Sequence, residues 1–321
     1  MPEPVDRSTQ WPYERGEVGA FFYQRYGSPT VAAAEAELGA LDGGTALLFP
    51  SGAGATTALI LTLLQPGDTI ALAEGSYFGT GKTFEALGRW GLRVVEFDQT
   101  GPPPEHADLI WLEAPSNPFL TMPELEAAIA HPARVVVDAT AATPIHLRPL
   151  EHGADFVVHS ATKYLAGHSD ALLGVVVCGD PAAAEELLAF RTRTGIVAAP
   201  DPAWLLLRGL KTLELRVRRQ TDTARILAKR LADHWAVATV RYPGFGGLMS
   251  FDVDDGEKAR AVETSTRVIV NSTSLGGVTS LIESRHRWEG DRVPPGLLRL
   301  SVGLEDPDVL WADLENALSA S

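Results

Sequence analysis

The chain has 321 residues, and its 27 Lys and Arg against 41 Asp and Glu give a formal net charge of −14 at pH 7. This acidic balance argues against nucleic acids and anionic membranes as partners, because proteins that bind them carry basic surfaces. Hydrophobic residues make up 45% of the chain, which is enough to form a core and argues against disorder. The single cysteine, Cys178, excludes an internal disulfide framework and a cysteine-based zinc site, and we expect no bound metal.

The N-terminal residues 1–17 are polar and lack the apolar core of a signal peptide. The most apolar runs, such as Leu172–Cys178, are far shorter than the about 20 residues that a membrane-spanning helix needs. These features predict a cytoplasmic protein, and the length of 321 residues predicts about two domains.

Short apolar, β-branched runs alternate with helical stretches between residues 45 and 178. Most of these runs are apolar at consecutive positions, which is typical of strands buried on both faces. The expected strands are Ala46–Phe49, Thr69–Ala73, Arg93–Phe97, Leu109–Leu112, Arg134–Val137, Phe156–Val158 and Leu172–Cys178. The expected helices between them include Ala53–Leu64, Gly81–Trp90 and Met122–Ala130. This alternation predicts an α/β fold with a mainly parallel sheet covered by helices.

The rest of the chain predicts a smaller α+β domain. A long helix, continuous or with a break, is expected from Asp201-Pro202, an N-cap followed by a first-turn proline, to about Trp235. Its basic residues, among them Arg216 and Arg218, are interpreted as a solvated face in so acidic a chain. Three strands and a closing helix are expected beyond it, at Leu248–Val253, Arg267–Val270, Leu297–Val302 and Pro307–Leu318.

Polar residues follow the expected strands of the first half repeatedly. Ligands of α/β sheets bind beyond the carboxyl ends of the strands. One such group alone would be read as an ordinary turn or cap, whereas five together predict a binding site at this edge. They are Ser51-Gly52-Ala53-Gly54, Glu74 and Tyr77, Glu113 and Ser116-Asn117, Asp138 and Thr140, and Ser160-Ala161-Thr162-Lys163.

The segment Ser51–Gly54 opens a helix, so its free backbone N–H groups suit a phosphate. The run Gly52–Thr57 reads G-x-G-x-x-T, which lacks the last glycine of the dinucleotide fingerprint. The hypothesis that the protein is a nicotinamide oxidoreductase would depend only on this incomplete match, and we therefore discount it.

Lys163 lies in a polar turn after a buried strand, where a lysine would be costly as structure alone. When neutral, its amine is a nucleophile able to form a Schiff base. Asp138 would be a buried carboxylate in need of a cation, such as a protonated pyridine nitrogen. Tyr77 offers an aromatic face to stack on a ring. Together with the phosphate segment, these residues predict a site for pyridoxal 5'-phosphate (PLP).

The segment Ser160–Asp170 (SATKYLAGHSD) resembles the PLP-lysine signature of the cystathionine γ-synthase-like, or Cys/Met-metabolism, family of fold-type I enzymes. Further matches in order are Tyr23–Thr30, Ser51–Ala55, Tyr77–Thr80, Glu113–Pro118, Val137–Pro144, Arg208–Leu213, Ser274–Gly277 and Leu298–Glu305. The resemblance implies a mainly parallel seven-stranded sheet in an α/β/α sandwich, with a smaller C-terminal α+β domain. It divides the chain into an arm at residues 1–38 that contacts a partner subunit, a PLP-binding domain at 39–200 and a C-terminal domain at 201–321.

The resemblance also implies a role for each site residue. Lys163 would bind PLP and then shuttle protons, and Asp138 would keep the pyridine nitrogen protonated. Tyr77 would stack on the ring and act as an acid or base at the leaving group. Further roles would be phosphate binding by Gly52, Ala53, Ser160 and Thr162, contact with the ring hydroxyl by Asn117, and binding of the substrate α-carboxylate by Arg299 and Ser274. Tyr23 and Arg25 would reach the phosphate in the partner subunit, so we expect at least a homodimer, assembled as a dimer of dimers.

The implied reaction is γ-elimination on cystathionine or a related sulfur amino acid, most like that of cystathionine γ-lyase, giving cysteine, 2-oxobutyrate and ammonia. A γ-replacement synthase or a β-lyase of the same family, including one of secondary metabolism, is the alternative. A catalytically idle PLP-fold scaffold is a further one, and the intact Lys163 and Asp138 argue against it.

Three departures from the family pattern bear on the substrate. Thr279 stands where γ-enzymes often carry Glu, and Gly79 stands where methionine γ-lyases usually carry Cys. The segment Ser284–Gly290 replaces the usual Pro/Ser/Thr/His-containing stretch, so that Arg285, Arg287 or Trp288 would reshape the mouth of the pocket.

Overall fold

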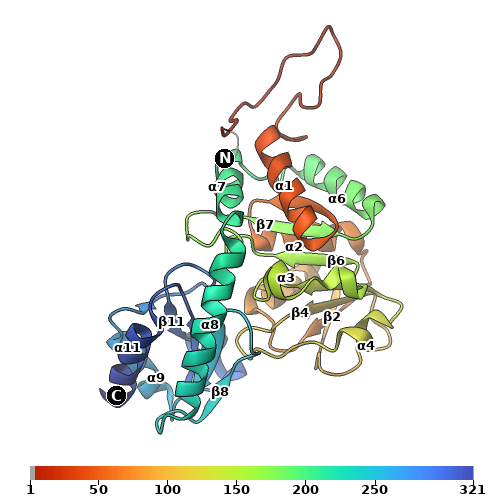
Figure 1. The fold of residues 1–321 in the computed structure, drawn as a ribbon. Helices are drawn as coiled ribbons and strands as arrows, with labels where there is room; N and C mark the ends of the chain where they lie inside the picture. The colour runs from red at the N-terminus through yellow and green to blue at the C-terminus, as the bar shows by residue number, and fades with distance from the viewer. Residues whose placement is uncertain (1–3, 321) are drawn as a thin grey trace.

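A computed structural model describes residues 4–320 and forms two β-sheets (Figure 1). The larger sheet has seven strands in the order β1-β7-β6-β5-β4-β2-β3, and only β7 runs antiparallel to its neighbours. Its strands are β1 (Thr45–Phe49), β2 (Thr69–Ala73), β3 (Arg93–Phe97), β4 (Leu109–Glu113), β5 (Arg134–Asp138), β6 (Phe156–His159) and β7 (Gly174–Cys178). The expected seven-stranded, mainly parallel sheet is therefore confirmed.

Helices cover both faces of this sheet, which explains why its strands are apolar at consecutive positions. In β5, for example, Val135 and Val137 pack into one buried cluster and Val136 packs into the other. The cluster with Val135 includes α1 (Pro29–Asp42) and α7 (Pro200–Leu210), and the other includes α2 (Gly52–Leu63), α3 (Phe78–Leu87) and α6 (Pro181–Thr194). The shorter elements of this half are α4 (Leu125–Ile129), α5 (Thr143–His146), and the 3-10 turns η1 (Gly88–Trp90) and η2 (Pro149–His152).

The smaller sheet has the order β10-β11-β12-β9-β8 and packs with the C-terminal helices at the far end of α8 (Figure 1). Its elements are α8 (Leu213–Ala232), β8 (Thr239–Arg241), β9 (Leu248–Asp252), α9 (Gly256–Ser265), β10 (Val270–Asn271), β11 (Leu281–Ser284), α10 (His286–Glu289), η3 (Gly290–Arg292), β12 (Leu297–Ser301) and α11 (Pro307–Ala320). Strands β8 and β11 were not expected. The strand expected over Arg267–Val270 is wrong for its first three residues, whose N–H groups donate instead to the carboxylate of Asp313.

The long helix expected from Asp201 is divided into α7 and α8 by the break at Lys211 and Thr212. The interpretation of its arginines as solvated is wrong for Arg216, which is 4% exposed. Its guanidinium donates to the carbonyls of Tyr164, Leu165 and Gly209. Arg216 therefore ties α8 to the turn that carries Lys163. No helix among residues 4–320 is long and apolar enough to cross a membrane.

Candidate active site

Three polar residues end neighbouring strands at one edge of the large sheet. Glu113 ends β4, Asp138 ends β5 and His159 ends β6. Register pairs Glu113 with Asp138, and the turn that follows His159 carries Lys163. Because these strands are parallel, their carboxyl ends meet, which brings the predicted residues of separate segments together.

The amine of Lys163 lies at the centre of this edge. Its Nζ donates a hydrogen bond to Oγ of Ser274, 2.8 Å away. Burial lowers the pKa of Lys163 from 10.5 to about 8, and the like charges of Arg299 and Arg285 act in the same direction. A substantial fraction of this amine is therefore neutral near pH 8, as a nucleophile or a proton acceptor requires.

Arg299 projects from β12 and is 3% exposed. Its guanidinium donates to Oδ1 of Asn117 at 3.0 Å, to the carbonyl of Ser274 at 2.9 Å, and to Glu283. Ser274 thus binds Lys163 through its side chain and Arg299 through its backbone. Its φ of 98° is a strained value for a residue other than glycine, as is common at functional sites.

Asp138 accepts two hydrogen bonds from Thr140, and both go to the same oxygen, Oδ1. No donor within residues 4–320 bonds its Oδ2. Burial raises the pKa of Asp138, while the bonds from Thr140 and the charge of His159 lower it. The free Oδ2 suits a cationic ring N–H, which is the role predicted from the sequence.

The start of α2 lies against the turn that contains Ser160. Ser51 caps this helix by accepting from the N–H of Gly54. A Cβ on Gly52 would meet Cβ of Ser160 at 3.2 Å, so the glycine leaves the approach to the helix N-terminus open. The exposed Ala53 and the Oγ of Ser160 border the same opening. The hydroxyl of Thr162 is instead engaged with the backbone of Leu173. The N-terminus of this helix fits a phosphate.

Tyr77 precedes α3 and is 42% exposed. Its backbone N–H donates to the buried carboxyl of Glu113, whose pKa burial and the charge of Asp138 raise well above 4.5. The ring lies over Gly79, where a Cβ would meet Cε1 of Tyr77 at 2.4 Å. Gly79 therefore gives the ring space that any other residue would fill.

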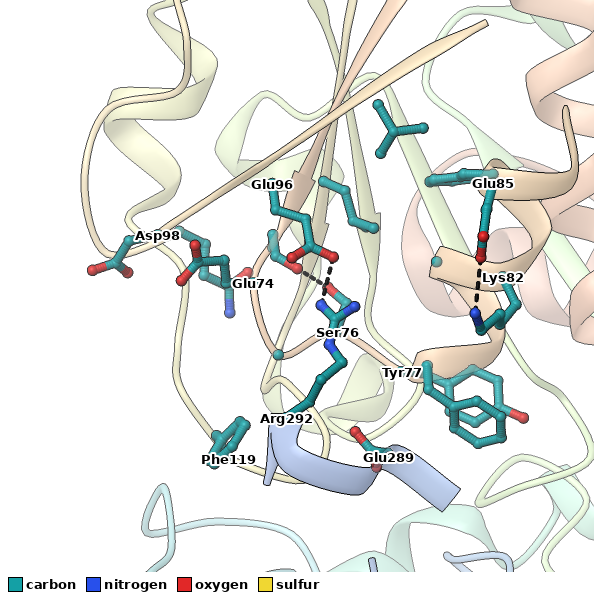
Figure 2. A pocket seen from close by; sticks show the side chains of 18 of the residues that line it. Glu74, Ser76, Tyr77, Lys82, Glu85, Glu96, Asp98, Phe119, Glu289 and Arg292 are labelled. Carbon is teal, nitrogen blue, oxygen red and sulfur yellow. Dashed lines mark hydrogen bonds and ion pairs between the residues drawn. The ribbon is translucent and has the colours of Figure 1, made fainter. Parts of the chain in front are cut away.

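A cavity of about 1480 Å³ adjoins the site on one side of Tyr77 (Figure 2). Lys163, Asp138 and Arg299 do not line it. Figure 2 shows Lys82 pointing toward Glu85, and Arg292 pointing toward Glu96. The other acidic residues that line the cavity are Glu74, Asp98 and Glu289. With five carboxylates against two cations, this cavity favours a positively charged ligand group.

Buried charges beside Arg299 are functional candidates that sequence reasoning found only in part. Glu283, 3% exposed, accepts from both Arg299 and Arg285, and Arg285 also donates to Glu289. Trp288 lines the cavity and donates to Glu283 at 3.1 Å. Arg287 instead pairs with Glu263. The charge-rich segment after Leu281–Ile282 was the available signal, and it did not show that Arg285 is buried.

Tyr23 and Arg25 do not join the other site residues within one chain. Arg25 donates to the carbonyl of Thr192 on α6 at 2.9 Å and lies over the rings of Tyr23 and Tyr26. The 45% exposed Tyr23 belongs to the arm that extends from the large sheet (Figure 1). Among residues 4–320, no group of three or more His, Cys, Asp or Glu is arranged to hold a metal ion.

The set of amine, free carboxylate oxygen, ring face and helix N-terminus fits PLP, and comparison with known proteins agrees. Residues 2–319 match the family described as Cys/Met metabolism PLP-dependent enzyme. The chain is 38% identical to the cystathionine gamma-synthase of Mycobacterium bovis, over 94% of this chain and 87% of that protein. It is 36% identical to the cystathionine gamma-lyase of Bacillus subtilis, over 94% of this chain and 90% of that protein.

A solved structure of cystathionine gamma synthase from Xanthomonas oryzae pv. oryzae, in complex with cystathionine, has a TM-score of 0.93 and 33% identity to this chain. The match covers 98% of this chain and 92% of that one. Family, fold and cofactor therefore agree, and the chain is a PLP-dependent carbon–sulfur lyase or synthase. It belongs to the family of PLP-dependent enzymes of cysteine and methionine metabolism.

Proposed function

We propose that this enzyme is a lyase that performs γ-elimination on cystathionine or a related sulfur amino acid. With water, cystathionine would give cysteine, 2-oxobutyrate and ammonia. The observation that carries the proposal is the placement of Ser274 between the amine of Lys163 and the guanidinium of Arg299. It sets a proton-transfer group beside a receptor for an α-carboxylate. The printed names of its relatives, which include both lyases and synthases, support this substrate class.

Bound PLP supplies an electron sink for the electrons released when a bond at the substrate Cα breaks. Lys163 would take the proton from the substrate Cα and move it onward. Arg299 holds the α-carboxylate, since its Nε–H has no acceptor within residues 4–320. Ser274 assists at the carboxylate and orients Lys163.

The remaining residues hold the cofactor. Asp138 would accept the ring N–H through Oδ2, and Tyr77 would stack on the ring and serve the leaving group as acid or base. Asn117, whose Oδ1 is used by Arg299, would contact the ring hydroxyl through its amide N–H groups, which have no acceptor within residues 4–320. The backbone of Gly52 and Ala53 would hold the phosphate together with Ser160 and Thr162. The hydroxyl of Thr162 would first have to turn from Leu173.

The acidic cavity beside Tyr77 supports a substrate with a second amino group, as cystathionine has. The distal half of such a substrate would pass Tyr77 and place its ammonium near Glu74, which also lies in the field of Arg292. Thr279, the position at which the sequence lacks a family glutamate, is exposed. Cavity carboxylates would therefore supply the negative charge that Thr279 does not.

The test is a substrate panel with separate assays for 2-oxobutyrate and free thiol, using cystathionine, homocysteine, methionine and activated homoserine esters. We expect both products from cystathionine. Consumption of an activated ester and cysteine without 2-oxobutyrate would instead make the enzyme a γ-replacement synthase, and pyruvate would indicate a β-lyase.

A matched pair of variants tests the cavity. Glu74→Gln is expected to raise KM for cystathionine at least about threefold while leaving KM for methionine unchanged, because only cystathionine carries the distal ammonium. Glu257→Gln, on α9, is the control and should change neither. Equal effects of Glu74→Gln on both substrates would contradict this use of the cavity.

We infer that the arm at residues 1–38 completes the site of a partner subunit, where Tyr23 and Arg25 reach the phosphate. Their separation from Lys163 within one chain and the exposure of Tyr23 support this assignment. The two-sheet arrangement supports the division into 39–200 and 201–321. We propose a dimer of dimers in the cytoplasm, where the unpaired, buried Cys178 suits a reducing compartment.

A further inference from the structure

Trp288 touches both the charged residues behind the site and the acidic cavity, and the roles given above leave it without a task. It belongs to α10 and to the segment Ser284–Gly290, which departs from the family pattern. Its Nε1–H donates to Oε2 of Glu283 at 3.1 Å, and the residue also lines the cavity beside Tyr77. It is 54% exposed, whereas a tryptophan that serves packing alone is usually buried more deeply.

Glu283, the acceptor of that bond, shares a face of the small sheet with Arg299. Register pairs Glu283 of β11 with Arg299 of β12, so the two side chains leave the sheet on the same side. Their strand neighbours pack into the core on the other side, namely Ile282, Leu298 and Leu300. The two charged side chains therefore point away from the core of the C-terminal domain and toward the active site.

The two oxygens of Glu283 have separate donors. Oε1 accepts from Arg299, from Arg285 at 2.8 Å and from Thr273 at 3.1 Å. Oε2 accepts from Trp288, and no other donor within residues 4–320 bonds it. The indole N–H therefore fixes the rotation of the carboxylate, which in turn sets where Oε1 holds the guanidinium of Arg299. Since that guanidinium would bind the substrate through its Nε–H, its orientation affects the affinity for the α-carboxylate.

The indole ring also borders the space that the distal half of the substrate would occupy. In the proposed reaction, this half passes Tyr77 and enters the cavity that Trp288 lines. Glu289 and Arg292, which follow Trp288 in the chain, line the same cavity (Figure 2). An indole ring binds methylene groups through apolar contact and an ammonium through its π-electrons. A substrate that extends beyond its sulfur would therefore gain a contact that a short substrate lacks.

We propose that Trp288 is a specificity-determining residue with two separate contacts. Its N–H positions Glu283, and thereby Arg299, for the α-carboxylate of every substrate. Its ring packs against the distal half of long substrates such as cystathionine. The proposal rests on the role of Arg299 as the carboxylate receptor in the proposed function.

Two substitutions separate these contacts. Trp288→Phe keeps an aromatic ring and removes the donor. Trp288→Gln removes the ring, while its amide N–H lies as many bonds from Cβ as the indole N–H does. Trp235→Phe is the control, since Trp235 is 75% exposed, lies beside His234 and Lys258, and does not line the cavity. Because Trp288 is half-exposed, both variants should keep the fold, which thermal denaturation checks.

The ligands are two compounds without a leaving group. One is carba-cystathionine, in which a methylene group replaces the sulfur, and the other is norvaline, which ends at a methyl group in the place of that sulfur. Their dissociation constants are measured by calorimetry on the PLP-loaded enzyme. Trp288→Phe should weaken both ligands similarly, at least about threefold, because Glu283 loses a charge-assisted hydrogen bond. The control should bind both ligands as the wild type does.

Trp288→Gln should change the two ligands differently. Norvaline should bind within about twofold of the wild-type affinity, because a donor to Glu283 is kept. Carba-cystathionine should bind at least about fivefold more weakly, because only the long ligand loses the contact with the ring. The ratio of the two dissociation constants thus reports the ring contact by itself.

The other outcomes each contradict one part of the proposal. Unchanged norvaline binding in Trp288→Phe, or an equal loss in Trp288→Gln, would refute the effect of the N–H on Arg299. An unchanged ratio of the two dissociation constants in Trp288→Gln would refute the ring contact. Arg299→Gln tests the proposed function separately, because full affinity for norvaline in that variant would refute the carboxylate receptor itself. Weak binding in Arg299→Gln with normal binding in both Trp288 variants would refute only the role of Trp288.

Discussion

The chemistry of the site depends on one amine whose pKa its neighbours set. Lys163 lies beside Arg299 and within the field of Arg285, and burial adds to their effect. Glu283 opposes that shift, and it also binds both arginines. Glu283 partly neutralises the two arginines, which allows both to lie near Lys163. The arginines still lower the pKa of the amine more than Glu283 raises it.

The rate at which cofactor-free protein takes up PLP should follow the neutral fraction of Lys163. We expect the rate of growth of the visible absorption band to rise with pH, with a midpoint near the pKa of about 8. Arg299→Leu removes a like charge and should move this midpoint to higher pH. Arg267→Leu, an exposed change away from the site, should leave it in place. A wild-type midpoint near 10.5, the ordinary value, would contradict the shift.

Residues that follow strands could be predicted from the strand pattern, whereas Arg299 and Ser274 entered the predicted site only through the family resemblance. Lys163, Asp138 and Gly52 stand at strand ends or helix starts, where position along the chain implies position in the fold. Arg299 and Asn117 are separated by 182 positions, and only the structure shows that they are bonded. Glu283 was missed because it lies in β11, a strand that the sequence did not predict, and because its partners Arg285 and Arg299 lie outside that strand.

At the scale of elements, α8 and the turn after β6 form one unit. Arg216 satisfies three carbonyls, two of them from Tyr164 and Leu165, directly after the lysine. Gly167 leaves room for this guanidinium, since a Cβ there would lie 2.1 Å from it. The position of Lys163 is therefore fixed from the side away from the substrate.

Arg216→Met should lower the free energy of unfolding by about 3 kcal/mol or more, because it leaves buried carbonyls without donors. It should also weaken PLP binding, since the turn of Lys163 loses its support. Arg218→Met is the matched control on the same helix, where Arg218 is exposed and paired with Glu214. Its effect should stay within about 0.5 kcal/mol. Chemical denaturation measures the free energy of unfolding of both variants. Equal losses of stability in Arg216→Met and Arg218→Met would contradict the anchoring role of Arg216.

The central strands could be predicted because a strand that helices cover on both faces has apolar residues at consecutive positions. The small sheet was harder, since β8 has three residues and β11 carries Glu283 and Ser284 within four positions. Arg216 was misread although the signal was present. It shares a helical stripe with the buried Leu213, Val217 and Gln220, a spacing that places it on the inner face of α8.

At the scale of the whole molecule, an acidic chain encloses a basic centre. The chain carries a net charge of −14, while Lys163, Arg285 and Arg299 gather at the site. The acidic cavity lies beside this centre, on one side of Tyr77. A substrate with a carboxylate at one end and a distal ammonium would match both regions.

Mixing two inactive variants tests the shared site. Arg25→Ala removes the arm contact, and Lys163→Ala removes the amine. In a mixed dimer, the intact Lys163 of one subunit can meet the intact Arg25 of the other. Reassembled equal mixtures should recover about a quarter of wild-type activity, because half the dimers are mixed and each has one complete site. No recovery, with mixed dimers demonstrated by mass, would place Arg25 outside the partner's site.

The buried amine of Lys163 also makes the cofactor-free enzyme less resistant to heat. An ammonium whose pKa falls from 10.5 to about 8 on folding destabilises the fold fully below pH 8, and this cost fades as pH rises to 10.5. Lys163→Met should therefore raise the free energy of unfolding of the empty protein by up to about 3 kcal/mol at pH 7, as measured by denaturation. A gain that persists unchanged at pH 10.5 would have another origin. Newly synthesised chains that have not bound PLP would accordingly be the form most exposed to proteolysis. The supply of PLP would then set the lifetime of the protein as well as its active fraction.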